Sequence, residues 1–339
     1  MADSHPAASY FLSFAEVARP ESPLYFALAT AIADDAELLA LTDEMMEHQP
    51  PPNVLLGAVH FLMLRGAHHE LSEYFASVGG GRQPDGYEIV ALRDFCDVHR
   101  DDLLPLLRRG RVQTNEVRRA TFLVPGFAWV AAQAKRPLAT IEVGTAAGLL
   151  TLWDRYGYDY GQDRVVGESP LTLSCELRGG VPDLELPPCR WSAGIDIEPV
   201  HVEEEDARDW LRALVWPDQP ERMERLESAI SIARDHPPRL VKGDGIDSLA
   251  GVVADAPADA ALVVHHSFSL NQVSAEERDR FDGVLGSLSA ERDIYLVAVD
   301  WVGSDDHFEL RAGQAQADGM RRTTLARVHH HGAWLDWVA

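Results

Sequence analysis

The sequence predicts an α/β protein in which an all-helical N-terminal domain precedes a mostly parallel β-sheet with flanking helices. Residues 1–136 carry apolar residues at helical spacing and no alternating strand pattern. Residues 137–339 alternate short apolar runs with amphipathic stretches, the order that builds βαβ units and a parallel sheet. Because 339 residues exceed one typical domain, we expect two domains that meet at Arg136-Pro137.

Four segments of the first domain show a helical pattern. One of them, Asn53–Leu64, is apolar all round and follows three prolines, so it predicts a buried helix with proline at its start. Gly79-Gly80-Gly81 indicates a loop. The helices are expected within Ser22–Met46, Asn53–Leu64, Tyr87–Leu107 and Thr114–Ala134.

The second domain contains five apolar runs of strand length that alternate with helical stretches. The strands are expected at Ala139–Val143, Trp191–Ile197, Arg239–Lys242, Ala260–His265 and Asp293–Val299. The helices are expected at Leu149–Tyr156, at Asp206–Arg234 with a break near Trp216-Pro217, and at Ser274–Leu288. We also expect an insertion near residues 157–190 and a terminal strand pair at Phe308–Ala312 and Thr324–His329.

The charge balance is strongly acidic and narrows the function. The chain has 30 basic and 54 acidic side chains, a formal net charge of −24. Such a surface repels phosphate backbones and anionic headgroups, so we expect no nucleic-acid or membrane binding. Lys135 and Lys242 are the only lysines, a pattern that a salt-adapted cytoplasm and a high-GC genome explain equally well.

The sequence also predicts a cytoplasmic chain without structural disulfides or zinc. Its three cysteines, Cys96, Cys175 and Cys189, are an odd number and lack CxxC spacing. The first residues have no positive region followed by a long apolar run, and no apolar stretch of 18 residues occurs. We therefore expect neither a signal peptide nor a membrane span.

A glycine-containing loop follows the first expected strand. In Glu142-Val-Gly144-Thr145-Ala-Ala-Gly148, Gly144 would allow a tight turn and close approach of a ligand, and Gly148 would let the next helix pack on the strand. The N–H groups that begin that helix would favour a polar or anionic ligand. The alternative is an ordinary strand–helix turn.

Two acidic residues follow the next two strands. Asp196, in Gly194-Ile-Asp-Ile-Glu-Pro, can accept hydrogen bonds from both hydroxyls of a ribose. Asp244, in Lys242-Gly-Asp-Gly, can accept one from an adenine amino group. A surface acid and a helix N-cap are the respective alternatives.

The fourth strand ends in His265-His266. A histidine at the centre of the sheet edge is a candidate general base, since its pKa lies near working pH. Adjacent strand residues point to opposite faces and no third ligand is near, so we expect no metal site. Packing in the core is the alternative for both side chains.

Two further segments carry candidate residues. Asn115, Glu116 and Arg118 open the last helix of the first domain and are candidates to reach a substrate, with simple capping as the alternative. The aromatic stretch Trp153–Gly161 would stack on a planar ligand or pack in the core. No G-x-S-x-G elbow and no GxxxxGK[ST] motif occur, which disfavours an α/β-hydrolase and excludes a P-loop NTPase.

The order of these motifs resembles class I S-adenosylmethionine-dependent methyltransferases. That resemblance implies a Rossmann-like sheet, with Glu142, Gly144, Thr145 and Gly148 at the methionine part of the cofactor, and Asp196 and Asp244 at its ribose and adenine. Ala146 replaces the middle glycine of the usual loop. The whole chain also resembles an uncharacterised prokaryotic family, DUF 2332, through QTNEVRR, EVGTAAGL, DRYGYDYG, GIDIEPV, WLRALVWPDQPER, GDGIDSL and HGAWLDWV.

The resulting hypothesis is a small-molecule methyltransferase that binds S-adenosylmethionine, with His265 or His266 as general base. Asn115, Glu116 and Arg118 would shape the substrate side. A nucleotide- or dinucleotide-binding enzyme is one rival, although the glycine spacing does not match GxGxxG. The other rival is a non-catalytic regulatory or scaffold protein, which Ala146 favours if its methyl group blocks the ligand.

Overall fold

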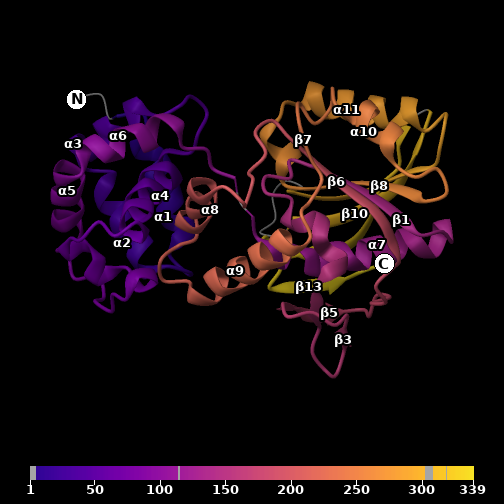
Figure 1. Cartoon of the computed structure of the whole chain (residues 1–339), viewed down its shortest axis with the longest axis horizontal. Helices are drawn as coiled ribbons and strands as arrows, with labels where there is room; N and C mark the ends of the chain where they lie inside the picture. Colours follow the sequence, from indigo (N-terminus) through magenta and orange to yellow (C-terminus); the bar gives the residue numbers. More distant parts are fainter. Residues whose placement is uncertain (1–4, 114, 302–307, 318) are drawn as a thin grey trace. The chain divides into compact units, whose positions relative to one another are not determined.

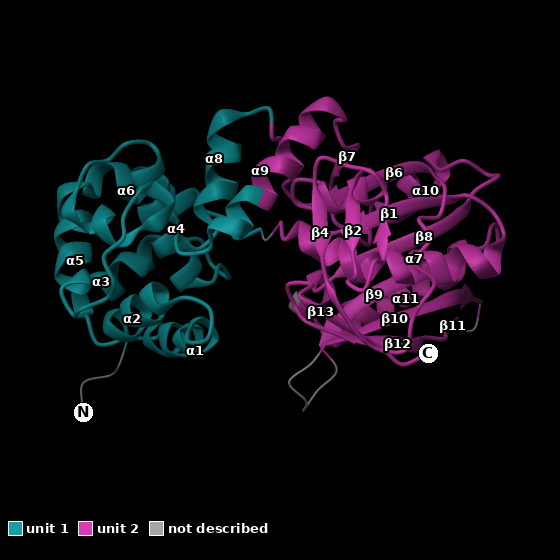
Figure 2. Cartoon of the chain, turned by 90° about the horizontal axis from the view of Figure 1, so that it is seen from below, with its two compact units in different colours: residues 1–114, 203–224 teal, residues 115–202, 225–339 magenta. Residues whose placement is uncertain are grey.

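The computed structural model describes residues 5–113, 115–301, 308–317 and 319–339, so the expected helix start at Thr114 lies outside it. The chain forms two compact units (Figure 2). The first comprises residues 1–114 and 203–224, and the second residues 115–202 and 225–339. None of the helices in the described ranges is long and apolar enough to cross a membrane.

The first unit is helical, as its apolar spacing predicts. Polar caps begin several of its helices: Ser22 accepts the N–H of Tyr25 at 3.1 Å, and Asp35 accepts that of Leu38. The apolar helix predicted at Asn53–Leu64 is buried on nearly all sides. The α-helices are α1 (Ala8–Ala18), α2 (Pro23–Ile32), α3 (Ala36–Ala40), α4 (Pro51–Leu64), α5 (Glu88–Val98), α6 (Arg100–Arg109) and α8 (Glu205–Ala213). The 3₁₀ turns are η1 (Leu41–Glu44), η2 (Glu70–Tyr74) and η3 (Ala76–Val78).

The division between the units differs from the expected boundary at residue 136. Helix α7 (Ala120–Ala134) packs on the sheet of the second unit, where a Cβ on Gly126 would lie 2.8 Å from Val297. The helix expected at Asp206–Arg234 is two helices, α8 and α9 (Pro220–Asp235). Pro217 cannot donate a helical hydrogen bond, and Pro220 begins the second helix, so the chain turns between them.

The second unit is built on a mixed sheet whose central strands are parallel (Figure 1). The strand order is β5-β13-β12-β10-β9-β8-β1-β6-β7. Five neighbouring strands of the sheet are parallel: β7, β6, β1, β8 and β9. Beyond β9, the strands β10, β12 and β13 pair antiparallel. The bounds are β1 (Leu138–Val143), β5 (Glu176–Gly179), β6 (Cys189–Asp196), β7 (Leu240–Lys242), β8 (Ala261–Ser267), β9 (Ile294–Trp301), β10 (Phe308–Gln316), β11 (Gly319–Met320), β12 (Thr323–Val328) and β13 (Trp334–Trp337).

Helices cover both faces of this sheet. Alternate apolar residues of β1 and β8, such as Ile141 and Val264, pack in a core with α10 (Leu249–Asp255) and α11 (Ala275–Leu288). The opposite face carries α7, whose Phe127 meets His265 with ring centroids 5.1 Å apart. This two-sided burial explains why the central strands read as continuous apolar runs.

The insertion between β1 and β6 contains a second, small sheet in the order β3-β2-β4. Its strands are β2 (Gly157–Asp159), β3 (Val165–Val166) and β4 (Thr172–Ser174). The aromatic residues that precede and form it are buried, and each tyrosine hydroxyl donates to a backbone carbonyl, such as Tyr160 to Thr121 at 2.7 Å. The core-packing alternative for Trp153, Tyr156, Tyr158 and Tyr160 therefore describes their role in the fold.

Candidate functional site

The candidate site lies at the carboxyl ends of β6, β1 and β8. Strand β1 pairs in parallel with β6 on one side and with β8 on the other. From β1 the chain adds β6 and then β7 on one side of the sheet, and it then adds β8 and β9 on the other side. Open α/β sheets bind ligands in the crevice at the point where the direction of addition reverses. The glycine loop, Asp196, Asp244 and the two histidines all come from the ends of these strands and of the neighbouring β7.

The loop after β1 has a left-handed backbone at three positions. Gly144 has φ 79°, Ala146 φ 51° and Gly148 φ 72°. This backbone costs a residue with a Cβ, such as Ala146, about 1–2 kcal/mol, and the hydrogen bond from its N–H to Asp196 helps to hold it there. At Gly148 a Cβ would lie 2.8 Å from side-chain atoms of Leu240 and Pro238, so this position also requires a hydrogen.

The backbone N–H groups of this loop are used within the protein. Those of Gly144 and Thr145 donate to the Ile195 carbonyl, and that of Gly148 donates to Thr145. The remaining two donate to side chains: Ala146 to Asp196 at 2.7 Å and Ala147 to Asn115 at 3.1 Å. The sequence predicts that amides here face a ligand, whereas in the structure they close the loop.

The helix expected at Leu149–Tyr156 is instead a 3₁₀ segment, η5 (Leu149–Arg155), with a kink at Leu152. The Tyr156 hydroxyl donates to the Leu149 carbonyl at 2.6 Å, and Thr151 bonds back to Gly148. These two hydroxyl groups occupy backbone carbonyls that would accept N–H groups in an α-helix. The loop therefore does not lead into an α-helix whose dipole would attract an anion.

Asp196 joins the loop to the end of β6. One carboxylate oxygen accepts the N–H of Ala146, and the other accepts that of Glu198 at 3.0 Å. The side chain is half-buried. Asp196 thus lies beside the glycine loop, as the sequence predicts, and it also holds the loop in its left-handed form.

Asp244 lies in a separate turn after β7. Its Oδ1 accepts the N–H groups of Ile246 at 2.9 Å and Asp247 at 3.0 Å, and its side chain is exposed. This is the capping geometry that the alternative interpretation describes. The exposed carboxylate nevertheless stands at the same edge of the sheet as Asp196, because β6 and β7 are parallel neighbours.

Glu142 is a buried acid beneath the loop. Its Oε2 accepts the Thr145 hydroxyl at 2.6 Å, and its side chain is almost fully enclosed. Burial raises the pKa of Glu142 to about 8, and the Asp196 charge adds to that rise, while the Thr145 hydrogen bond and Arg119 oppose it. Glu142 therefore carries a proton at neutral pH and supports the loop from inside.

The two histidines of β8 point to opposite faces of the sheet, as their adjacency predicts. His265 lies on the α7 face against Phe127, and His266 lies on the α11 face against Phe281, with centroids 6.0 Å apart. Both side chains are buried. Burial lowers the pKa of His265 to about 3, and the neighbouring His266 lowers it further.

The candidate residues before α7 belong to the second unit. Asn115 contacts the glycine loop through Ala147. Glu116 is buried, accepts the N–H of Arg118 at 3.1 Å and lies 3.8 Å from the Arg225 Nε. The Arg118 Nε donates to the Ser174 carbonyl at 2.7 Å, so of the three only Asn115 has a contact with the loop among the described bonds.

The chain matches, over residues 8–337, the family model described as an uncharacterized protein conserved in bacteria (DUF2332). It belongs to the DUF2332 family. The resemblance to the DUF 2332 family is thereby confirmed. A search of the curated proteins returns no match.

Two further residues of the candidate site were not predicted from the sequence. The Ser269 hydroxyl donates to the Val143 carbonyl at 2.6 Å, and a Cβ on Gly144 would lie 2.4 Å from the Ser269 Cβ. Asp300 lies near the end of β9, with its Oδ1 3.6 Å from the Nδ1 of His266. Asp300 directly follows the fifth predicted strand, so the rule that ligands bind at strand ends would have found it.

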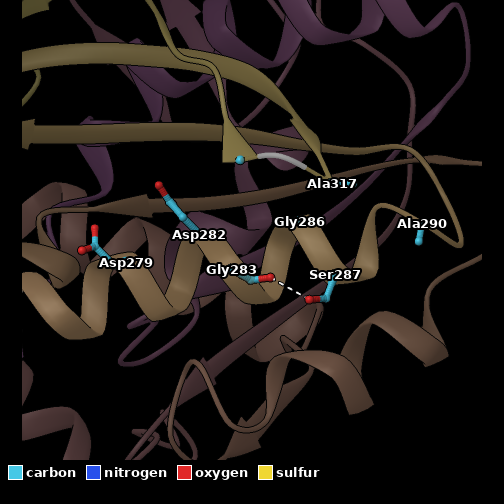
Figure 3. Close-up of a pocket in the computed structure, with 8 residues that line it drawn as sticks. Asp279, Asp282, Gly283, Gly286, Ser287, Ala290 and Ala317 are labelled. Atoms are coloured by element: carbon cyan, nitrogen blue, oxygen red, sulfur yellow. Dashed lines mark hydrogen bonds between the residues drawn. The ribbon is translucent and has the colours of Figure 1, made fainter.

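A pocket of about 460 Å³ lies elsewhere in the second unit of the DUF2332 chain (Figure 3). It is lined by the later turns of α11 and by the β10–β11 turn, with Asp279, Asp282 and several small residues. Asp282 forms a bidentate pair with Arg322. The pocket contains none of the sequence-predicted site residues.

Proposed function

We propose that the second unit binds S-adenosylmethionine and acts as a small-molecule methyltransferase. The observation that carries the proposal is the bond between Asp196, at the end of β6, and the left-handed loop after β1. This pair stands where the strand order reverses, next to the exposed carboxylate of Asp244. The same three features carry the resemblance to class I methyltransferases in the sequence.

The strand order supports this proposal. Numbered along the chain, the parallel strands β1, β6, β7, β8 and β9 lie in the order 3-2-1-4-5, which is the order of doubly wound nucleotide-binding sheets. The next strand, β10, is antiparallel to β9. Fold analogy alone does not define an activity, because one fold carries many functions, and activity is determined by the residues of the site.

The amide N–H groups of the loop after β1 are already bonded within the protein, which favours S-adenosylmethionine over a dinucleotide as the ligand. Sheets that bind NAD hold its pyrophosphate with loop amides and a helix N-terminus. Here Asp196 and Asn115 accept the N–H groups of Ala146 and Ala147, and a kinked 3₁₀ segment follows. S-adenosylmethionine carries a ribose and an adenine but no phosphate, so it does not need those amides.

The residues present fit the nucleoside part of that ligand. Asp196 and Asp244 are carboxylate acceptors for ribose hydroxyls and for an adenine amino group, and a carboxylate can accept more than two hydrogen bonds. When bound, the sulfonium supplies an activated methyl group. The protein's own contribution would be to orient the ligand and to exclude water.

Isothermal titration calorimetry of the full chain with S-adenosylhomocysteine, NAD and ATP tests the proposal. We expect saturable binding of S-adenosylhomocysteine alone. Asp196→Asn should weaken it about 10- to 100-fold, the effect of losing a charge-assisted hydrogen bond of about 1.5–3 kcal/mol. The exposed Asp255→Asn, at the far end of α10, is the matched control and should bind as the wild type does.

Binding of NAD instead would favour the dinucleotide rival. Absence of binding by a folded chain, or equal binding by Asp196→Asn, would contradict the proposal.

A ligand-binding protein without catalysis is a second candidate. The observation that favours it is the burial of both histidines, which are 0% and 1% exposed. Such a protein would bind S-adenosylhomocysteine in the calorimeter yet transfer no methyl group to any phenol, amine or carboxylate acceptor. Measured turnover with any one of these acceptors would exclude it.

A further inference from the structure

Asp300 is an acidic neighbour of His266 in the core of the second unit. His266 on β8 pairs in register with Ala298 on β9, and Asp300 lies two residues further along β9, on the same face of the sheet. The Nδ1 of His266 and the Oδ1 of Asp300 are 3.6 Å apart. Both atoms are buried, and neither has a hydrogen-bond partner within the described chain.

This arrangement is unusual because buried polar atoms are nearly always hydrogen-bonded. The separation exceeds a hydrogen bond by about half an ångström, a gap that a small side-chain rotation closes. Hydrogen bonds of catalytic pairs are often long in ligand-free enzymes and shorten in the complex. The His266 Nδ1 and the Asp300 Oδ1 are therefore close enough to form a hydrogen bond after a small movement, although they do not form one here.

The charged groups around His266 act in both directions. Burial lowers its pKa, the Asp300 carboxylate opposes that effect, Arg322 lowers it further, and Asp282 on α11 opposes it. Asp282 and Arg322 form their own bidentate pair (Figure 3 shows Asp282 on α11). Among the residues that the structure describes, Asp300 is then the carboxylate that faces the ring. The Asp300 side chain is 24% exposed, whereas that of His266 is 1% exposed, so Asp300 reaches solvent and the ring does not.

His265 lacks such a partner. Its two ring nitrogens have no hydrogen-bond partner within the described chain, and its ring packs on Phe127. The carboxyl group in register with it, Glu142, is held by Thr145 and carries a proton at neutral pH. A neutral acid cannot stabilise an imidazolium ion as Asp300 can.

We infer that His266 and Asp300 form the proton-accepting pair of the second unit, with Asp300 as a positioning residue that orients Nδ1, and that His265 is structural. The role in transfer rests on the proposed function, whereas the pairing does not.

One proton is released for each methyl group transferred to an O–H or N–H nucleophile. The heteroatom–hydrogen bond breaks, the heteroatom–carbon bond forms, and the electron pair of the broken carbon–sulfur bond remains on sulfur. His266 takes the proton, and Asp300 stabilises the resulting imidazolium ion.

Long-range ¹H–¹⁵N spectra of the histidine rings, recorded against pH on the ligand-free full chain, test the pairing. His266→Gln identifies the resonances of His266. We expect the wild-type ring to be neutral with its proton on Nδ1, facing Asp300. In Asp300→Asn the pKa of His266 should fall further, because the opposing carboxylate is lost, and the Nδ1-protonated form should lose its predominance.

The control is Asp279→Asn, which removes an acid of α11 that does not act on His266. Its spectrum of His266 should match the wild type. An unchanged titration and tautomer in Asp300→Asn would overturn the pairing, as would His265 responding in place of His266. Because no ligand is present, this result is independent of S-adenosylhomocysteine binding.

A second measurement tests the role in transfer. Asp300→Asn should bind S-adenosylhomocysteine with the wild-type Kd, because it lies outside the nucleoside contacts. Its turnover with an accepted substrate should fall and shift in pH dependence, and Asp300→Glu should restore part of it. Loss of binding, or wild-type turnover with an unchanged pH profile, would overturn the role.

Discussion

Glu142 shows how one buried side chain links the sequence motif to the stability of the loop. Its carboxyl group lies at the start of Glu142-Val-Gly144-Thr145-Ala-Ala-Gly148, but it faces inward and accepts the Thr145 hydroxyl. The sequence predicts Glu142 as a cofactor contact, since its position matches the loop motif through which the chain resembles class I methyltransferases. Burial could not be deduced there, because it depends on α7 and η5 covering that face of the sheet.

Glu142→Gln should stabilise the chain more at pH 8 than at pH 5. The pKa of Glu142 is raised from 4.5 to about 8 by burial, so the folded state holds the proton more tightly than the unfolded state does between these values. The stability that this proton provides is complete below pH 4.5 and is lost as the pH rises through about 8. The glutamine keeps an acceptor for Thr145 and does not titrate.

Urea unfolding at several pH values measures this effect. The difference in unfolding free energy between Glu142→Gln and wild type should grow by at most about 1.4 kcal/mol per pH unit. Glu291→Gln, an exposed substitution, is the control and should follow the wild-type profile. A constant difference across this range would show that Glu142 is ionised in the folded chain.

The histidines illustrate what a motif can and cannot reveal. Their position at the end of a central strand and their opposite orientations follow from strand periodicity. Which of them has an acidic partner does not follow, because Asp300 comes from a strand 34 residues later and meets His266 only through the β8–β9 register. Long-range pairing of this kind is set by the whole sheet.

At the level of single elements, the parallel strands of the sheet are the most predictable part of the fold. The strands expected at Ala139–Val143, Arg239–Lys242 and Ala260–His265 each begin within one residue of β1, β7 and β8. Short strands outside the core were missed: β13 has four residues and pairs with β5, which is distant in sequence. Local patterns indicate burial, whereas the partner of an edge strand depends on the rest of the chain.

The apolar spacing after β1 predicts a helix, whereas the segment forms a 3₁₀ turn. Its apolar residues at Leu149, Leu150 and Leu152 fit a helical pattern, but Tyr156 and Thr151 take backbone acceptors through their hydroxyls. Gly148, directly before it, is held close to Pro238 and Leu240. This close approach makes Gly148 the most constrained residue of the loop.

Gly148→Ala should therefore destabilise the second unit more than Gly161→Ala. Both glycines have nearly the same left-handed φ, 72° and 73°, but a Cβ at Gly161 would meet nothing within 4 Å. We expect Gly161→Ala to cost about 1 kcal/mol from the backbone alone. Gly148→Ala should cost about 1–3 kcal/mol more, because the methyl group overlaps Leu240 and Pro238.

Thermal and urea unfolding of the two variants separates these contributions. Equal losses in both would indicate that the backbone conformation alone requires glycine and that the close packing at Gly148 relaxes.

For the whole molecule, the net charge of −24 is the dominant electrostatic feature. Like charges repel in the compact state, and salt shortens the range of that repulsion from about 10 Å at 0.1 M to about 3 Å at 1 M. Adding NaCl at pH 7.5 should therefore raise the Tm by several degrees. The surface ion pairs weaken at the same time, but each contributes only about 0–1 kcal/mol.

The same experiment at pH 5, near the sequence pI of about 4.9, provides the control. The net charge is then small, and the salt effect should largely disappear. A Tm that falls with salt at pH 7.5 would mean that attractive ion pairs outweigh the repulsion.

The division of the chain into two units was only partly foreseen. The change of pattern at Arg136-Pro137 falls between α7 and β1, but α7 packs on the sheet, and residues 203–224 return to the helical unit. The sequence of an apolar helix such as α7 does not indicate which unit the helix packs against. The membership of α7 also places Asn115, which precedes it, against the glycine loop, where its Oδ1 accepts the N–H of Ala147.

Backbone amide hydrogen exchange of the full chain, with and without saturating S-adenosylhomocysteine, locates the ligand that we propose. Protection should increase in the segments that follow β1, β6 and β7, around residues 144–148, 196–200 and 243–248. The helices of the first unit that lie before residue 110 provide the internal reference and should not change. Protection confined to other segments, or no change in a folded chain, would contradict a ligand site at this edge of the sheet.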